Sequence, residues 1–216
     1  MKQRDAFLEG EGDAWFQRNT GKADAQFDSQ SDVLLTEISA LVPHIDAALP
    51  PSILEIGCGD GRRLAWLKDN RKFECFGIEP SERAVEIARR RGIDVRRGTA
   101  EQLPFDNRSF DIVVFGFCLY LCDREDLFRI ASEADRVLKS SGWLVLLDFY
   151  DTAPSMRAYH HREGLFSHKM DYTALFSWHP AYTVFSHKLR HHSDGGYTDD
   201  PQEWVATSVL RKHQPK

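Results

Sequence analysis

Short apolar runs alternate with helical patterns through the middle of the chain. Between the runs, apolar side chains recur three or four positions apart, as in amphipathic helices, at residues 62–68, 82–91 and 127–138. The runs themselves have the length of buried strands, and they cover residues 52–56, 73–78, 93–96, 110–115 and 143–149. Strands that alternate with helices predict an α/β domain, with a parallel sheet covered on both faces.

The two flanks of this alternation have other patterns. Residues 1–31 are polar and aromatic, which predicts a short helix or arm, and residues 32–49 have helical spacing that Pro50 and Pro51 bring to an end. After Tyr150 the sequence is irregular as far as Asp171. We expect the remaining elements to be a helical turn and two further strands, at residues 172–178, 181–190 and 204–212.

Composition narrows the class of protein. The 216 residues hold 28 Lys and Arg against 33 Asp and Glu, a net charge of −5, and 42% hydrophobic residues, which fits one folded domain. We expect no membrane insertion and no secretory signal, because no apolar run reaches about 18 residues and the N-terminus is polar. The acidic balance is unlike that of proteins that bind phosphate backbones. The four cysteines form no C-x-x-C pair, so we expect free thiols in a reducing cytoplasm.

A glycine-rich loop follows the first strand, in the sequence ILEIGCGDG at residues 53–61. Glycines there let the backbone turn tightly and approach a ligand, and the helix that follows offers unpaired N–H groups. A dinucleotide-binding loop requires G-x-G-x-x-G, but Arg62 stands where its last glycine would fall. Glu79 ends the next strand, where an acid can accept both hydroxyls of a ribose. The pattern therefore argues against a pyrophosphate site and for a ribose.

Four motifs occur in a fixed order: E-x-G-x-G-x-G at residues 55–61, Glu79, GTAEQLPF at residues 98–105, and FDIV at residues 110–113. Over residues 50–150 the chain resembles a class I S-adenosylmethionine-dependent methyltransferase, of the small bacterial group with E-x-G-x-G-x-G and LPF…FD signatures. Residues 11–19 and 166–172 are similar to methyltransferases of cell-surface sugar biosynthesis.

The resemblance implies a Rossmann-like, seven-stranded, mostly parallel sheet with helices on both faces and an antiparallel last strand. It implies a single domain over residues 1–216. Its parts would be a helical arm or lid at 1–49, a cofactor-binding core at 50–150, and an acceptor-shaping segment with the final two strands at 151–216.

The resemblance also implies S-adenosylmethionine as cofactor and S-adenosylhomocysteine as product. The ribose would lie on Glu79, and the methionine carboxylate would meet Arg18 of the arm. Glu55 would bind the cofactor or fix the glycine loop. Thr99 stands where many relatives carry Asp, and its hydroxyl can still bond the adenine amino group. The other residues implied at the cofactor are Gly57, Cys58, Gly59, Pro80, Ala100, Glu101, Phe115 and Phe117.

Candidate acceptor residues lie toward the carboxyl ends of the strands, where open α/β sheets bind their ligands. A hydroxyl acceptor benefits from a general base, for which we consider Tyr150, His160 and His161, with Tyr120 and His168 facing the acceptor. A solvated pair is the alternative for His160 and His161. We expect no metal, because histidines four apart on a strand, such as His187 and His191, lie about 13 Å apart.

The sequence thus predicts a cytoplasmic monomer or homodimer that transfers a methyl group to a small molecule, with a cell-surface sugar or nucleotide sugar as the specific acceptor. We expect no DNA substrate, because residues 115–118 read FGFC where DNA-base methyltransferases carry (N/D)-P-P-(Y/F). The alternative is a regulatory protein that binds S-adenosylmethionine and transfers nothing.

Overall fold

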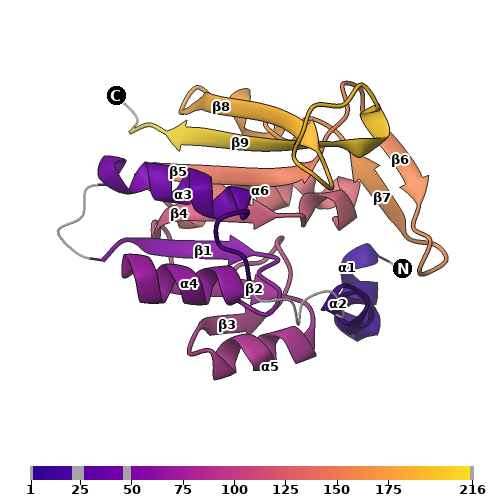
Figure 1. The fold of residues 1–216 in the computed structure, drawn as a ribbon, viewed down its shortest axis with the longest axis horizontal. Coiled ribbons are helices and arrows are strands. Elements are labelled where there is room, and N and C mark those ends of the chain that lie inside the picture. The colour runs from indigo at the N-terminus through magenta and orange to yellow at the C-terminus, as the bar shows by residue number, and fades with distance from the viewer. Residues whose placement is uncertain (1, 21–26, 46–49, 215–216) are drawn as a thin grey trace.

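Seven strands form one sheet in the order β3-β2-β1-β4-β5-β9-β8, in a computed structural model that describes residues 2–20, 27–45 and 50–214 (Figure 1). The first five strands are mutually parallel, and β9 runs antiparallel to both of its neighbours. This arrangement confirms the predicted Rossmann-like sheet. The strands are β1 Ser52–Ile56, β2 Glu74–Glu79, β3 Asp94–Arg97, β4 Phe110–Gly116, β5 Leu138–Phe149, β8 Tyr182–His191 and β9 Trp204–Lys212.

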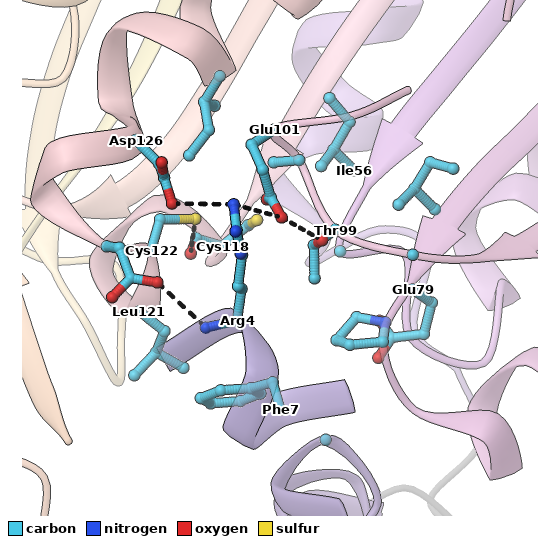
Figure 2. Close-up of a pocket in the computed structure, with 18 of the residues that line it drawn as sticks. Arg4, Phe7, Ile56, Glu79, Thr99, Glu101, Cys118, Leu121, Cys122 and Asp126 are labelled. Carbon is cyan, nitrogen blue, oxygen red and sulfur yellow. Dashed lines mark hydrogen bonds and ion pairs between the residues drawn. The ribbon is translucent and has the colours of Figure 1, made fainter. Parts of the chain in front are cut away.

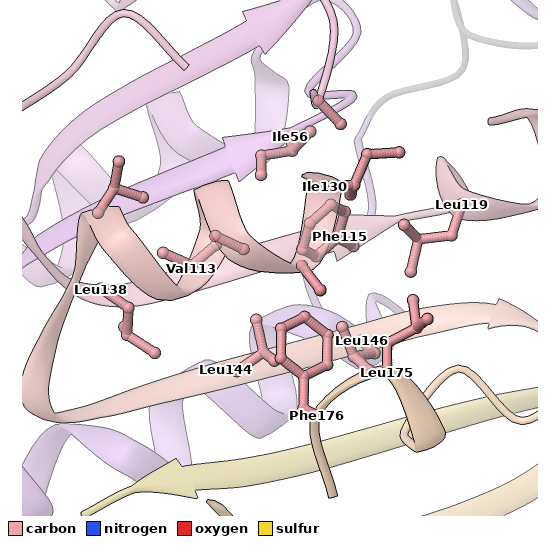
Figure 3. Packing of buried hydrophobic residues seen from close by; sticks show 14 of the residues in the cluster. Ile56, Val113, Phe115, Leu119, Ile130, Leu138, Leu144, Leu146, Leu175 and Phe176 are labelled. Carbon is pink, nitrogen blue, oxygen red and sulfur yellow. The ribbon is translucent and has the colours of Figure 1, made fainter. Parts of the chain in front are cut away.

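Helices cover both faces of the sheet because its central strands are apolar on both sides. Ile53 and Val114 pack toward one face, under α3 Val33–Leu41, α4 Arg62–Arg71 and α5 Glu82–Arg90. Leu54 and Phe115 pack toward the other, under α6 Leu127–Val137 and α7 Ala174–Ser177. Figure 3 shows Phe115 of β4 and Leu146 of β5 between Ile130 of α6 and Phe176 of α7. Successive strand residues alternate between the two faces, so each strand supplies both cores.

The N-terminal segment consists of α1 Gln3–Ala6, the wide turn η1 Phe7–Glu11, and α2 Gly12–Thr20. It lies at the carboxyl ends of the parallel strands (Figure 1). The Asp13 carboxylate accepts hydrogen bonds from the Ser81 hydroxyl at 2.6 Å and the Arg83 N–H at 3.1 Å, at the start of α5. A Cβ on Gly12 would lie 3.1 Å from the Ser81 nitrogen, so α2 packs closely on this loop.

Two segments differ from the sequence expectations. The helix expected over 32–49 ends at Leu41 and becomes a 3-10 turn at Val42–His44, because Pro43 has no N–H to continue the helix. The stop expected at Pro50 is therefore wrong; residues 46–49 lie outside the described part of the chain. The stretch expected to be irregular contains a two-stranded antiparallel hairpin, β6 Ser155–Ala158 and β7 Phe166–Lys169. Each of its strands has only four residues, too few for a periodic pattern to predict them.

No helix within residues 2–20, 27–45 and 50–214 is both long and apolar enough to cross a membrane.

Candidate functional site

The glycine loop joins β1 to α4 and folds back on β2. The N–H groups of Gly57 and Cys58 donate to the Ile78 carbonyl oxygen, at 2.8 and 3.2 Å. Gly57 has a φ of +77°, a left-handed backbone that favours glycine, and a Cβ there would lie 3.0 Å from the Cβ of Cys118. Glycine at this position therefore lets the loop turn and lie against the segment that follows β4.

Glu79 closes β2 beside this loop. One oxygen of its buried carboxylate accepts the Gly59 N–H and the other accepts the Ser81 N–H, each at 2.9 Å. Ser81 in turn caps α5 by accepting the Ala84 N–H at 3.1 Å. Burial raises the pKa of Glu79 to about 7, against the effect of the two backbone hydrogen bonds. Glu79 thus ties the glycine loop to the start of α5.

Glu55 lies behind the loop, in β1. Arg63 of α4 pairs with Glu55 and, at 2.9 Å, with Asp32, which caps α3. Burial raises the pKa of Glu55 to about 7, although the charge of Arg63 opposes the shift. The second carboxylate oxygen, Oε2, is buried without a hydrogen-bond partner among the described residues. A Cβ on Gly116 would lie 3.3 Å from the paired oxygen, so this carboxylate is next to the end of β4.

A pocket of about 790 Å³, partly open to solvent, follows the carboxyl ends of the first four strands (Figure 2). The N-terminal segment closes one side with Arg4, Phe7, Gly12 and Trp15. The rest of the wall consists of Ile56, Gly57, Ile78, Glu79, Pro80, residues 98–101, residues 116–118, Leu121, Cys122, Asp123, Asp126 and Ile130.

Polar side chains gather at one end of the pocket. The Thr99 hydroxyl donates to Glu101 at 2.6 Å. The Arg4 guanidinium lies 3.6 Å from Glu101 and 3.3 Å from Asp126, and Figure 2 shows Arg4 between these two carboxylates. Asp123 accepts the backbone N–H of Arg4 at 3.1 Å. These contacts attach α1 to the pocket, so Arg4 and the two aspartates belong to the site. The sequence analysis missed them.

Asp148 of β5 shapes the part of the wall that follows β4, which we call the methionine end after the expected position of the cofactor. One oxygen of its buried carboxylate accepts the N–H groups of Cys118, Leu119 and Tyr120, at 3.1, 2.8 and 3.3 Å. Burial raises the pKa of Asp148 to about 7, against these hydrogen bonds. Asp148 therefore fixes the 3-10 turn η3, Leu119–Leu121, directly after Phe117 and Cys118 in the pocket wall.

The pocket brings together most of the residues expected at the cofactor: Gly57, Glu79, Pro80, Thr99, Ala100, Glu101 and Phe117. The others lie outside its wall. Phe115 is buried in the core under α6, and the Cys58 thiol faces Gly77, where a Cβ would lie 2.4 Å from the sulfur. Gly59 contributes its N–H to Glu79, and Glu55 lies behind the loop.

Arg18 does not reach the pocket. Its guanidinium contacts the Glu11 carboxylate at 2.5 Å and the Tyr159 hydroxyl at 2.8 Å. Tyr159 precedes the turn between β6 and β7, so Arg18 joins α2 to this hairpin. The buried Glu11 carboxylate, seven residues before Arg18, thus neutralises the guanidinium that the sequence analysis assigned to the methionine carboxylate.

The residues expected at the acceptor are dispersed. His160 and His161 are exposed in the turn between β6 and β7, and the Tyr150 ring lies 5.4 Å from that of His187. Burial lowers the pKa of His168 to about 4, with help from the charge of Arg124. None of these four lines the pocket. Tyr120 lies beside it, because its hydroxyl accepts a hydrogen bond from the Trp15 indole at 3.2 Å.

Comparison with known sequences agrees with this geometry. Residues 54–146 match the family model described as a methyltransferase domain. An uncharacterized protein of Mycobacterium tuberculosis is 38% identical over 135 residues, which are 62% of this chain and 41% of that protein. The tRNA N(3)-methylcytidine methyltransferase of Drosophila melanogaster is 32% identical over 151 residues, 62% of this chain and 46% of that protein. The chain spans less than half the length of these two curated relatives.

A solved structure extends the likeness to the whole fold. It is the 1,6-didemethyltoxoflavin-N1-methyltransferase of Burkholderia thailandensis with 1,6-didemethyltoxoflavin and S-adenosylhomocysteine bound. It is 16% identical, with a TM-score of 0.68, and the match covers 98% of this chain and 87% of that one. The matched family model spans the glycine loop, Glu79 and the wall from Thr99 to Asp126. Residues 54–146 therefore resemble a methyltransferase domain in sequence, and the structural match extends the likeness in fold to nearly the whole chain.

Proposed function

We propose that this protein transfers a methyl group from S-adenosylmethionine to a small-molecule acceptor. The observation that carries the proposal is the position of Glu79. Its carboxylate lies at the end of β2, beside the glycine loop and in the wall of a pocket of about 790 Å³. A carboxylate has about four lone-pair sites, and backbone N–H groups use two, so two remain for ribose hydroxyls.

The remaining residues fit the same cofactor. The unpartnered Glu55 oxygen suits an ammonium donor, which a methionine moiety carries. Ile78 and Ile130 offer apolar surface for a purine, and Thr99 with Glu101 offers hydrogen-bonding groups at its edge. The ribose, the methionine ammonium and the adenine each have a counterpart in this chain.

When bound, the cofactor supplies an activated methyl group as a sulfonium, and the protein positions the two reactants. Glu79 binds and orients the ribose. Asp148 holds the backbone after Phe117, which forms the wall beside the expected methyl group. Phe7 and Trp15 line the side of the pocket that the N-terminal segment closes, and there they limit the access of water.

Two sets of observations bear on the chemical class of the methyl acceptor. Relatives include methyltransferases of tRNA, demethylmenaquinone and fatty acids, and the Burkholderia enzyme binds a small heterocycle. A small molecule suits this partly open pocket better than a folded RNA. A cell-surface sugar or nucleotide sugar is a second class, favoured by the similarity of residues 11–19 and 166–172 to enzymes of that pathway. Four free cysteines suit a reducing compartment such as the cytoplasm.

Calorimetry tests cofactor binding, and turnover tests catalysis. We expect S-adenosylmethionine and S-adenosylhomocysteine to bind one site per chain. We expect S-adenosylhomocysteine to accumulate when the protein is incubated with S-adenosylmethionine and a metabolite extract. Binding without any product in such extracts would favour the regulatory alternative. The absence of binding would refute the proposal.

A further inference from the structure

Four ring side chains from three separate segments meet beside the methionine end of the pocket: Phe117, Tyr120, Phe149 and His192, here called the ring cluster. The Phe149 centroid lies 5.3, 5.0 and 5.0 Å from those of Phe117, Tyr120 and His192. Trp15, which lines the pocket, donates its indole N–H to Tyr120. All five side chains are partly exposed, so the cluster presents ring surface at the rim of the site.

The backbone at Phe117 is strained in a way that serves this placement. Phe117 has a φ of +51°, in the left-handed region that residues other than glycine rarely adopt. Its N–H donates to the Leu147 carbonyl oxygen at 2.8 Å, which holds the conformation. Strain of this kind persists where a site requires one geometry. Here it directs an aromatic ring into the pocket wall between Gly116 and Cys118.

A positive charge borders the cluster. The Lys169 ammonium lies 5.2 Å from the centroid of the Phe149 ring and donates to the Gln202 carbonyl oxygen. No carboxylate in the described part of the chain lies within 4.0 Å of this ammonium. Burial lowers the pKa of Lys169, with help from the charge of Arg157, while the more distant charges of Glu203, Asp151 and Asp200 oppose the shift. An anionic group placed here would therefore be stabilised by the Lys169 ammonium.

The wall at the methionine end offers no evident base. It consists of Gly12, Trp15, Gly116, Phe117 and Cys118. The hydrogen bond with Cys122 and burial both raise the pKa of Cys118, so its thiol stays protonated. An acceptor that is already ionised at neutral pH needs no base at this place.

We propose that the methyl acceptor is a small aromatic carboxylate, with its ring on the ring cluster and its charge near Lys169. This inference rests on the proposed function. A carboxylate oxygen forms the new bond to the methyl carbon, while the methyl–sulfur bond breaks and leaves its electron pair on sulfur. The anion and the sulfonium become a neutral methyl ester and a neutral thioether, and no proton moves.

Benzoate is the first probe, compared with octanoate (a carboxylate without a ring), benzyl alcohol (a ring without the charge) and a nucleotide sugar. Saturation-transfer NMR on the full chain loaded with S-adenosylhomocysteine measures binding, and mass spectrometry measures methyl ester formed from S-adenosylmethionine. We expect benzoate to bind at least about fivefold tighter than octanoate and benzyl alcohol, since aromatic contacts and a partly desolvated charge each contribute.

Three variants test whether Lys169 and Phe149 account for the binding of benzoate. Lys169→Met should weaken benzoate binding about tenfold, and Lys169→Arg should restore most of it. Phe149→Leu keeps an apolar side chain and should weaken binding several-fold. Lys68→Met is the matched control, because Lys68 also donates to a backbone carbonyl, that of Gly92, away from the pocket. Melting temperatures check that each variant is folded.

The outcomes separate the two proposals. If S-adenosylhomocysteine binds but benzoate does not, or if benzyl alcohol or the nucleotide sugar is preferred, the acceptor inference is overturned and the proposed function stands. The same holds if Lys169→Met and Phe149→Leu bind benzoate as the native chain does. If S-adenosylhomocysteine itself fails to bind, the proposed function fails.

Discussion

Replacing Glu79 by Gln tests the proposed ribose contact with little change in shape. The carboxylate accepts two backbone N–H groups, from Gly59 and Ser81, each at 2.9 Å. An amide keeps one accepting oxygen and substitutes an NH₂ group, which cannot accept, for the other. One backbone donor then loses its partner, and so does one ribose hydroxyl.

The expected loss of affinity follows from the charge of the Glu79 carboxylate. A hydrogen bond to a charged group contributes about 1.5–3 kcal/mol, and about 1.4 kcal/mol corresponds to a tenfold change in Kd. Losing one such bond to the ribose should therefore weaken S-adenosylmethionine binding roughly 10- to 150-fold. The unpaired backbone donor should lower the free energy of unfolding by about 1–3 kcal/mol.

Calorimetry at pH 8 measures the affinity, and urea unfolding measures the stability. Glu82→Gln is the matched control, because Glu82 begins α5, is exposed and points away from the pocket wall. We expect this control to bind within about twofold of the native chain, since exposed ion pairs contribute little. If Glu79→Gln remains folded and binds within threefold of the native chain, Glu79 does not hold the ribose and the assignment of the pocket is wrong.

Three further predictions follow from the geometry. Arg18→Ala should leave the affinity for S-adenosylmethionine within about twofold, because Arg18 contacts Glu11 and Tyr159 and does not line the pocket. It should lower the melting temperature, because Glu11 and Tyr159 lose their partner. A fivefold loss of affinity in calorimetry would show that Arg18 belongs to the site. The free energy of unfolding should fall as pH rises from about 5 to 7. In the folded chain Glu79 and Asp148 keep their protons up to a pKa of about 7, whereas in the unfolded chain they release them near 4. Urea unfolding that gives a higher free energy of unfolding at pH 7.5 than at pH 5.5 would contradict this. Replacing exposed His160 and His161 together by Ala should leave the rate of S-adenosylhomocysteine formation within about twofold, and a loss of more than tenfold would show that the hairpin turn reaches the acceptor.

Sequence patterns predicted the sheet well where packing is local. The strand at residues 52–56 has an apolar run interrupted only by Glu55 after Ser52 and is followed by a glycine, so its predicted bounds are the observed ones. The pocket wall from Gly57 to Phe117 was predictable for the same reason, because its members follow strand ends that a parallel sheet brings to one edge.

The features that the sequence did not predict depend on contacts between residues far apart in the chain. Arg4 enters the pocket through its ion pair with Asp126, 122 positions away, and no local pattern selects that partner. The strands of the β6–β7 hairpin have four residues each, too few for a periodic pattern, and the Phe166 N–H donates to the side chain of the distant Gln3. Arg18 was assigned to a ligand because its partner Glu11 is only recognisable once α2 has folded against η1.

The position of β9 bears on how the chain acquires its structure. Residues 204–212 fill the gap between β5 and β8, and they pair Trp143 with Arg211 and Thr183 with Arg211 across the two ladders. Until these residues emerge from the ribosome, β5 and β8 have no common neighbour, and their backbone edges are open to other chains. The residues of the pocket wall are encoded upstream of β9, so they are synthesised before these two edges are paired. Truncation before Trp204 should therefore yield insoluble protein, although every residue of the pocket wall would still be present.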